Sequence, residues 1–212
     1  VSKRLYDAIP DADWRKHSWL DPEREDYYPY KFAGNEADKD DFLNGMPAAR
    51  DYQALKFRPA QGECSDFNVG NAGDFCMMRI EEMYFIEAEA MYHLEPAEGV
   101  KLLQDFIKDY RYSSYDRISA GADENAFLTE LLLQKRIEFW GEGILFFDYK
   151  RMDMGITRSY PGSNHAGVYK LNTVGRSPQW NIVVTRREFQ NNTAITEDTN
   201  NPDPSDKIEL QS

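Results

Sequence analysis

Two glutamates four residues apart, Glu138 and Glu142, are the side chains of this sequence that are best placed for chemistry. On one helix their Cβ atoms would lie about 5–6 Å apart. Retaining glycosidases use two carboxyl groups about 5–5.5 Å apart, one as the acid and one as the nucleophile. Basic residues in the same segment would keep both glutamates ionised, however, whereas a general acid needs a raised pKa. We therefore expect a structural ion network rather than catalysis, made by Arg136, Glu138, Glu142, Asp148 and Arg151.

Other motifs of enzymes and metal sites are not found in the sequence. It has no glycine-rich phosphate loop, no HExxH zinc helix and no GxSxG nucleophile elbow. His17, His93 and His165 are far apart, and none has an evident nucleophile or metal-binding partner. We therefore expect no catalytic residue, no metal site and no cofactor. Cys64 and Cys76 flank a loop-like segment, and their spacing is compatible with a disulfide and with two reduced thiols.

Aromatic residues crowd into one stretch near the start of the chain. Rings with a polar tip can pin an irregular segment to the helices behind it, or they can offer a flat surface to a ligand. Packing is the more general interpretation, and a ligand platform is the functional alternative. The candidate ligand-binding residues are Trp14, Trp19, Tyr27, Tyr28 and Tyr30.

Charge and composition limit the class of partner. The 25 basic and 37 acidic residues give a formal net charge of −12, which argues against nucleic acid, because that affinity comes from clustered Lys and Arg. Hydrophobic residues make up 41% of the chain, enough for a core, and no run approaches the roughly 18 apolar residues that span a membrane. The chain starts at Val1 with no signal peptide and no lipidated cysteine, so we expect a portion of a longer protein.

A helix that starts near Asp123 must position the glutamate pair. Apolar or small side chains recur there at steps of three and four residues, which is typical of an amphipathic helix. They are Ala126, Thr129, Leu133, Ile137, Trp140 and Ile144, with Leu128, Leu131 and Leu132 beside them. Asp123 can cap the start of this helix, and Gly141 and Gly143 can end it in left-handed conformations.

A helical hairpin is expected before that helix, in residues 74–110. Its apolar stripes are Met77, Ile80, Tyr84, Ala88 and Met91 on the first helix, and Val100, Leu103, Ile107 and Tyr110 on the second. A short turn at residues 94–96 joins the two helices into a unit of about 34 residues, the size of a tetratricopeptide repeat. One hairpin cannot bury its own apolar face, so we expect the helix that starts near Asp123 to pack on it.

Three segments follow from these patterns. Residues 1–73 form an irregular, aromatic-rich segment that prolines interrupt and that packs on the helices. Residues 74–151 form the helical core, and residues 152–212 form a loop-rich closing segment. The sequence therefore predicts a mainly α fold of tetratricopeptide-like helix hairpins, an α-α superhelix, with a loop-rich irregular lobe.

Several motifs in the same order resemble the SusD/RagB family of outer-membrane glycan-binding lipoproteins. LKFRP at 55–59 and DFCMMRIEEMYFIEAEAMYHL at 74–94 are similar to the family's lysine-aromatic strand and its Arg-x-x-Glu-Met-Tyr helix. KRIEFWGEGILFFDYKR at 135–151 resembles its Arg-x-Glu-x-x-x-Glu-Gly motif. RSYPGSNH at 158–165 and NNPDPSD at 200–206 resemble closing segments of the family. VTRREFQNN at 184–192 resembles its Ile-Pro-x-x-Glu-x-x-x-Asn motif, except that Thr185 stands where proline is usual.

The resemblance implies one domain, equivalent to the family's C-terminal half, with no catalytic activity. Such a protein is held on the extracellular face of a Gram-negative outer membrane by a lipid anchor, which this chain does not carry. It captures oligosaccharides, or sometimes peptides, and delivers them to a SusC-like TonB-dependent transporter. Because sugar rings stack on Trp and Tyr, the aromatic stretch of residues 14–32 has the residue types of such a site.

Two other functions stay open. A helical-repeat scaffold that binds a protein or peptide partner is the usual role of a tetratricopeptide-like solenoid judged without the resemblance. A glycoside hydrolase is the weaker alternative, and it requires Glu138 and Glu142 as the reacting carboxyl groups. Binding of oligosaccharides without cleavage would distinguish the capture function from both.

Overall fold

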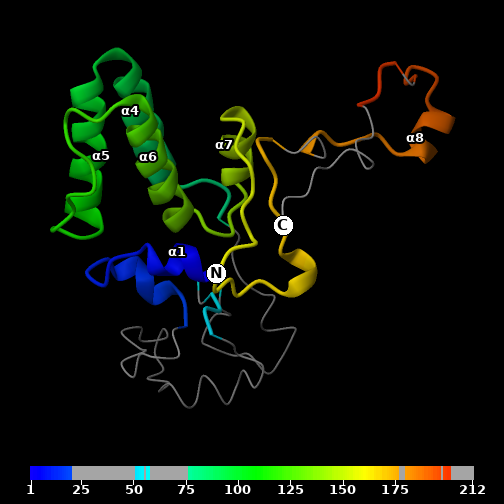
Figure 1. Ribbon diagram of the computed structural model, residues 1–212. Coiled ribbons are helices and arrows are strands. Elements are labelled where there is room, and N and C mark those ends of the chain that lie inside the picture. Colours follow the sequence, from blue (N-terminus) through cyan, green and yellow to red (C-terminus); the bar gives the residue numbers. More distant parts are fainter. Residues whose placement is uncertain (21–50, 55, 58–75, 177–179, 197, 202–212) are drawn as a thin grey trace. The chain divides into compact units, whose positions relative to one another are not determined.

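The described part of the chain is mainly helical, which confirms the expected fold class. The structure, a computed structural model, describes residues 1–20, 51–54, 56–57, 76–176, 180–196 and 198–201 (Figure 1). Its helices are α1 (Lys3–Asp7), α4 (Ile80–Leu94), α5 (Pro96–Tyr110), α6 (Glu124–Glu138), α7 (Leu145–Arg151) and α8 (Arg186–Asn191), with 3-10 helices η1 (Trp14–Ser18) and η3 (Gly167–Tyr169). In these residues β structure is limited to two isolated antiparallel bridges, Trp19 with Ala54 and Thr157 with Asn172.

Helices α4 and α5 form the expected hairpin, and α6 packs on α4 (Figure 1). Helix α4 ends at Leu94, and Pro96 is the first residue of α5, a position where proline loses no helical hydrogen bond. The Tyr92 ring of α4 stacks on the Phe127 ring of α6, with centroids 4.0 Å apart and planes 7° apart. The Tyr92 hydroxyl donates to the carbonyl of Ala122 at 3.0 Å. The tetratricopeptide-like geometry beyond this hairpin stays a prediction.

The buried faces of these helices differ in part from the expected ones. On α5 the prediction is right for Val100, Leu103 and Ile107, whereas Tyr110 is 55% exposed. Helix α4 buries Phe85, Ala88 and Tyr92, of which Ala88 was expected. Ile80 and Tyr84, which were expected to be buried, are exposed, and so is Met77, which lies before the helix. Helix α6 buries Phe127, Glu130, Leu131, Leu132, Gln134, Lys135, Ile137 and Glu138, while Ala126 and Thr129 are exposed. Both α4 and α6 carry apolar residues on more than one side, so periodicity alone did not select the buried side.

The start of α6 is capped as expected. The Asp123 side chain accepts a hydrogen bond from the backbone N–H of Ala126 at 2.8 Å. The helix ends at Glu138, before the two glycines that were expected to stop it. Gly141 and Gly143 do have positive φ angles, 79° and 84°, so they shape the turn that follows the helix rather than its last residue.

We predict that Asp123→Ala lowers the free energy of unfolding by about 1 kcal/mol, because one N–H of the first turn loses its acceptor. Urea unfolding followed by circular dichroism measures this change. Asp123→Asn is the matched variant, since an asparagine oxygen can accept the same hydrogen bond. Equal losses in both variants would show that the cap contributes through its charge instead.

The chain divides into two compact units, Val1–Glu142 and Gly143–Ser212. In the first unit a core cluster of Leu5, Tyr6, Ile9, Trp19 and Ile137 joins the N-terminal segment to α6. In the second unit the Trp180 ring lies near those of Phe146 and Tyr149 of α7, at 5.6 and 6.3 Å between centroids. The segment boundaries expected at residues 73 and 151 do not coincide with this division and stay predictions.

None of the helices in the described residues is both long enough and apolar enough to span a membrane.

Candidate functional site

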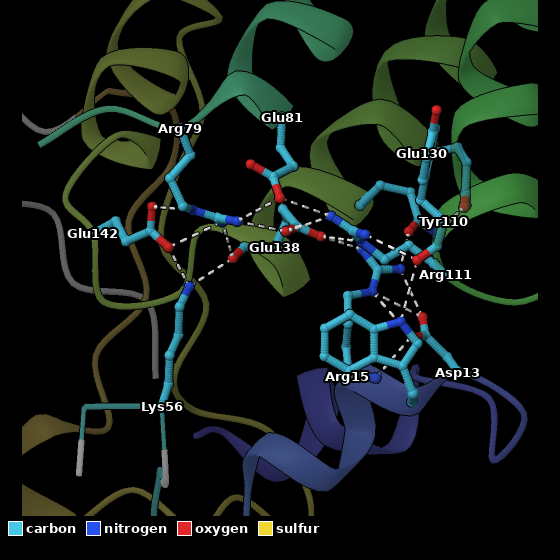
Figure 2. A network of polar contacts seen from close by, with 12 residues as sticks. Asp13, Arg15, Lys56, Arg79, Glu81, Tyr110, Arg111, Glu130, Glu138 and Glu142 are labelled. Atoms are coloured by element: carbon cyan, nitrogen blue, oxygen red, sulfur yellow. Dashed lines mark hydrogen bonds and ion pairs between the residues drawn. The ribbon is translucent and has the colours of Figure 1, made fainter. Parts of the chain in front are cut away.

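A buried carboxylate that three arginines contact is the centre of the polar network in the first unit (Figure 2). The Glu138 side chain, 5% exposed, lies at the end of α6. Arg111 donates two parallel hydrogen bonds to it, from Nε to Oε2 at 2.7 Å and from Nη2 to Oε1 at 2.9 Å. Arg79 donates to Oε1 at 2.9 Å and Arg15 to Oε2 at 3.0 Å. Each carboxylate oxygen therefore accepts two charged N–H donors.

Arg79 connects this carboxylate to the second glutamate. Its Nε donates to Glu142 Oε2 at 3.1 Å, and its Nη2 donates to the backbone carbonyl of Glu138 at 2.9 Å. Lys56 Nζ donates to the same carbonyl at 2.7 Å and also to Glu142 Oε1. Glu81 lies 3.2 Å from Arg79 Nη1 and 3.3 Å from an Arg111 nitrogen. Segments far apart in the sequence thus meet at the turn that follows α6.

The network continues into the N-terminal segment and along α6. Arg15 is 3% exposed and donates to the fully buried Asp13, with a shortest distance of 2.6 Å, and to Gln134 Oε1 at 2.6 Å. The amide of Gln134 donates to Glu130 Oε1 at 2.7 Å, and the Tyr115 hydroxyl donates to the same oxygen at 3.1 Å. Buried polar groups that are paired in this way restrict a core to one arrangement.

The electrostatics of this network keep its central carboxylate ionised. Burial alone would raise the pKa of Glu138, but the hydrogen bonds and charge of Arg111, with Arg15 and Arg79, outweigh burial and lower the pKa to about 2. Burial likewise opposes the charge of Arg79, yet hydrogen bonds from its guanidinium to Glu142 and Glu138 raise its pKa above the ordinary value. A carboxylate with so low a pKa holds no proton near neutral pH, so Glu138 is unsuited to act as a general acid.

Some expected members of the ion network belong to it and others do not. Glu138 and Glu142 both take part, although Glu142 lies in the turn after α6 rather than one helical turn along it. Asp148 and Arg151 form their own ion pair in the second unit, at 2.8 Å within α7. Arg136 is half-buried and is not among the described residues whose contacts form the network.

Sequence reasoning missed the arginines that contact Glu138, because it sought cations within the same segment. Arg15, Arg79 and Arg111 lie 123, 59 and 27 residues away in the sequence. One signal pointed to Arg79, which opens the Arg-x-x-Glu-Met-Tyr motif at the start of α4. Nothing comparable marks Arg15 or Arg111, since a single arginine in an irregular segment has no periodic pattern to interpret.

The candidate ligand-binding aromatics that the structure describes, Trp14 and Trp19, differ in exposure. Trp14 is 47% exposed, so it can offer a ring face to a ligand. Trp19 is 1% exposed and packs edge-on against Trp140, with ring centroids 6.1 Å apart, so its ring is covered by the protein. The other three candidates, Tyr27, Tyr28 and Tyr30, lie outside the described residues and stay predictions.

A small pocket lies beside the network in the first unit. Trp14, Lys56, Arg79 and Glu138 contribute to its walls, and its volume is about 140 Å³. Pockets that enclose small organic ligands are usually about 300–1,000 Å³. This pocket has room for a few water molecules and cannot itself enclose an oligosaccharide.

The other candidates for chemistry are dispersed. His93 Nδ1 lies 3.9 Å from Glu124, and burial lowers the pKa of His165. Cys76 is exposed, and its pairing with Cys64 falls outside the described residues. Within the ranges that the structure describes, no three or more His, Cys, Asp or Glu side chains are grouped to hold a metal ion.

Comparison with known proteins gives one kind of match. The model of the SusD family matches residues 19–210, which is most of the 212-residue chain. This range includes Arg79, Arg111, Glu138 and Glu142, and it starts after Trp14. No curated protein and no solved structure matches the chain.

Proposed function

This chain belongs to the SusD family, and we propose that it captures oligosaccharides at the cell surface and delivers them, uncleaved, to a SusC-like TonB-dependent transporter. Members of the family are generally non-catalytic carbohydrate-binding proteins of nutrient uptake, and an outer-membrane surface lipoprotein is typical of it. The match over residues 19–210 is the observation that carries the proposal. We place the protein on the extracellular face of the outer membrane, anchored by a lipid.

The geometry of the network supports capture over hydrolysis. Glu138 has its two oxygens occupied by Arg15, Arg79 and Arg111, and its pKa of about 2 removes the proton that a catalytic acid would donate. Glu142 is held by Arg79 and Lys56. Both carboxylates are thus held by cations. A glycosidase would need these carboxylates free to contact its substrate.

Calorimetric titration of this chain with a panel of neutral oligosaccharides tests the proposal, with mass spectrometry of the sugars after long incubation. We expect saturable binding of at least one oligosaccharide and no shorter products. Release of shorter sugars would contradict the capture function and support a glycoside hydrolase that uses Glu138 and Glu142. A folded sample that binds none of the panel would contradict glycan capture by this chain.

A protein or peptide scaffold is the second candidate, and one observation favours it. Several large apolar side chains of α4 and of the residues just before it are exposed: Met77, Met78, Ile80, Met83, Ile86 and Leu94. Apolar surface of this kind marks contact sites for other proteins. Binding of peptides by a sample that binds no oligosaccharide would support this second function.

A further inference from the structure

Three exposed aromatic side chains from separate segments are joined through one cluster of contacts in the first unit. Trp14 of η1 is 47% exposed, Tyr84 of α4 is 40% exposed and Tyr110 of α5 is 55% exposed. Periodicity predicted that Tyr84 and Tyr110 would be buried, whereas the fold places both at the surface. Each has an apolar ring and a polar tip, the residue type that stacks on a ligand while still contacting water.

Specific contacts fix the positions of these rings. The indole Nε1–H of Trp14 donates to the backbone carbonyl of Tyr110 at 3.2 Å. Tyr84 stacks on the buried ring of Phe106, with centroids 5.1 Å apart and planes 26° apart. Tyr110 lies 5.6 Å from Phe106 and 6.1 Å from Tyr84. Tyr84 and Tyr110 therefore lie beside each other, and Trp14 is held at the backbone of Tyr110; we call these three rings the aromatic surface.

The guanidinium of Arg111 packs against two rings of this cluster, Trp14 and Phe106. Its guanidinium lies 5.6 Å from the centroid of the Trp14 ring and 5.0 Å from that of Phe106. The same guanidinium is held by two hydrogen bonds to Glu138, and its side chain is 8% exposed. The ion network of α6 thus orders Arg111, and Arg111 orders Trp14, so the rings lose little freedom when a ligand binds.

We propose that Trp14, Tyr84 and Tyr110 bind a neutral oligosaccharide along this aromatic surface. The proposal rests on the glycan-capture function proposed above and names where the sugar binds. Sugar rings present C–H faces that pack on aromatic rings and hydroxyls that bond to polar tips. Three rings from three segments offer more contact than one sugar unit needs, which favours an oligosaccharide over a monosaccharide.

Charge selects among the classes of oligosaccharide. The chain has a formal net charge of −12, and Asp109 is exposed next to Tyr110. The nearby cation, Arg111, is already paired with Glu138 and Glu81. A glycan made of uronic acids or carrying sulfates would meet repulsion from Asp109 and from the negative charge of the chain.

Calorimetry with maltoheptaose, cellohexaose, xylohexaose and mannohexaose identifies the neutral ligand that binds best, and hexagalacturonate serves as the anionic comparison. With that neutral ligand we expect Tyr84→Ala, Tyr110→Ala and Trp14→Ala each to raise Kd about tenfold. Tyr84→Phe and Tyr110→Phe keep the ring and lose only the hydroxyl, so each should raise Kd less than its alanine variant. Tyr169→Ala, at a 60% exposed tyrosine of η3, is the matched control and should leave Kd unchanged.

The outcomes separate this inference from the function on which it rests. If an oligosaccharide binds and the three alanine variants bind it as well as the unchanged protein, the aromatic surface is not the site, while glycan capture stands. If none of the oligosaccharides binds, both are overturned. Tighter binding of hexagalacturonate than of the neutral sugars would overturn the stated ligand class.

A second measurement does not depend on the alanine variants folding. With ring-labelled tyrosine in the unchanged protein, the bound oligosaccharide should shift the nuclear magnetic resonance signals of Tyr84 and Tyr110 and leave that of Tyr169 in place. The conservative phenylalanine variants assign the signals. Shifts at Tyr169 without shifts at Tyr84 and Tyr110 would place the sugar elsewhere and overturn the inference.

Discussion

Replacing Glu138 by glutamine is expected to lower the free energy of unfolding by about 3–5 kcal/mol, because it leaves buried arginines without their shared anion. Arg15 and Arg111 have side chains that are 4% and 8% exposed, so water cannot replace the lost carboxylate. The amide of glutamine also presents N–H donors to groups that are themselves donors. The size and shape of the side chain stay the same, and the effect therefore measures the charge and its hydrogen bonds.

Urea unfolding near neutral pH measures this loss. Glu87→Gln, at an exposed position of α4, is the matched control and should change stability by less than about 0.5 kcal/mol. A Glu138→Gln protein as stable as the control would show that the three arginines find other partners.

The same variant should change how stability depends on pH. The folded pKa of Glu138, about 2, lies below the ordinary value of 4.5, so the folded state binds fewer protons than the unfolded state between these values. The contribution of ionised Glu138 to the free energy of unfolding is therefore present above about pH 4.5. It is lost as the pH falls toward 2, by an amount on the order of 3 kcal/mol. Over that interval the free energy of unfolding of Glu138→Gln should fall less steeply with pH than that of the unchanged protein. Equal slopes for the two proteins would contradict a lowered pKa of Glu138.

A side chain at Gly99 is expected to separate α4 from α5. A Cβ atom there would lie 2.3 Å from the backbone N and 2.4 Å from the Cα of Tyr92, and backbone atoms inside a helix cannot move aside alone. We predict that Gly99→Val costs about 3 kcal/mol through overpacking. Because Tyr92 also stacks on Phe127 of α6, the damage should extend beyond the hairpin.

Gly121→Ala is the matched control for Gly99, since an added Cβ there would contact nothing within 4 Å. Thermal unfolding, with near-ultraviolet circular dichroism to report on the packing of the aromatic rings, compares the two variants. We expect the Gly99→Val protein to lose its aromatic signal at a lower temperature while the Gly121→Ala protein resembles the unchanged chain. Similar melting temperatures for both would show that the hairpin can adjust at Gly99.

The elements of the helical core follow from local patterns. The turn at residues 94–96, the cap at Asp123 and the buried side of α5, except for Tyr110, are as expected from the sequence. Local chemistry decides each of these features: proline cannot donate within a helix, and an aspartate oxygen accepts from the first turn. The family motifs are likewise strings of neighbouring residues, and the match over residues 19–210 confirms what they indicated.

The sequence by itself therefore determined the fold class, the family and the participation of Glu138 and Glu142 in an ion network. Only the tertiary structure decided which cations contact these glutamates, that Trp14 is exposed while Trp19 is buried, and that the rings of Tyr84 and Tyr110 lie side by side. The physical reason is that an ion pair or a ring contact depends on distance in space. Arg15 and Glu138 are 123 residues apart along the chain and 3.0 Å apart in the fold.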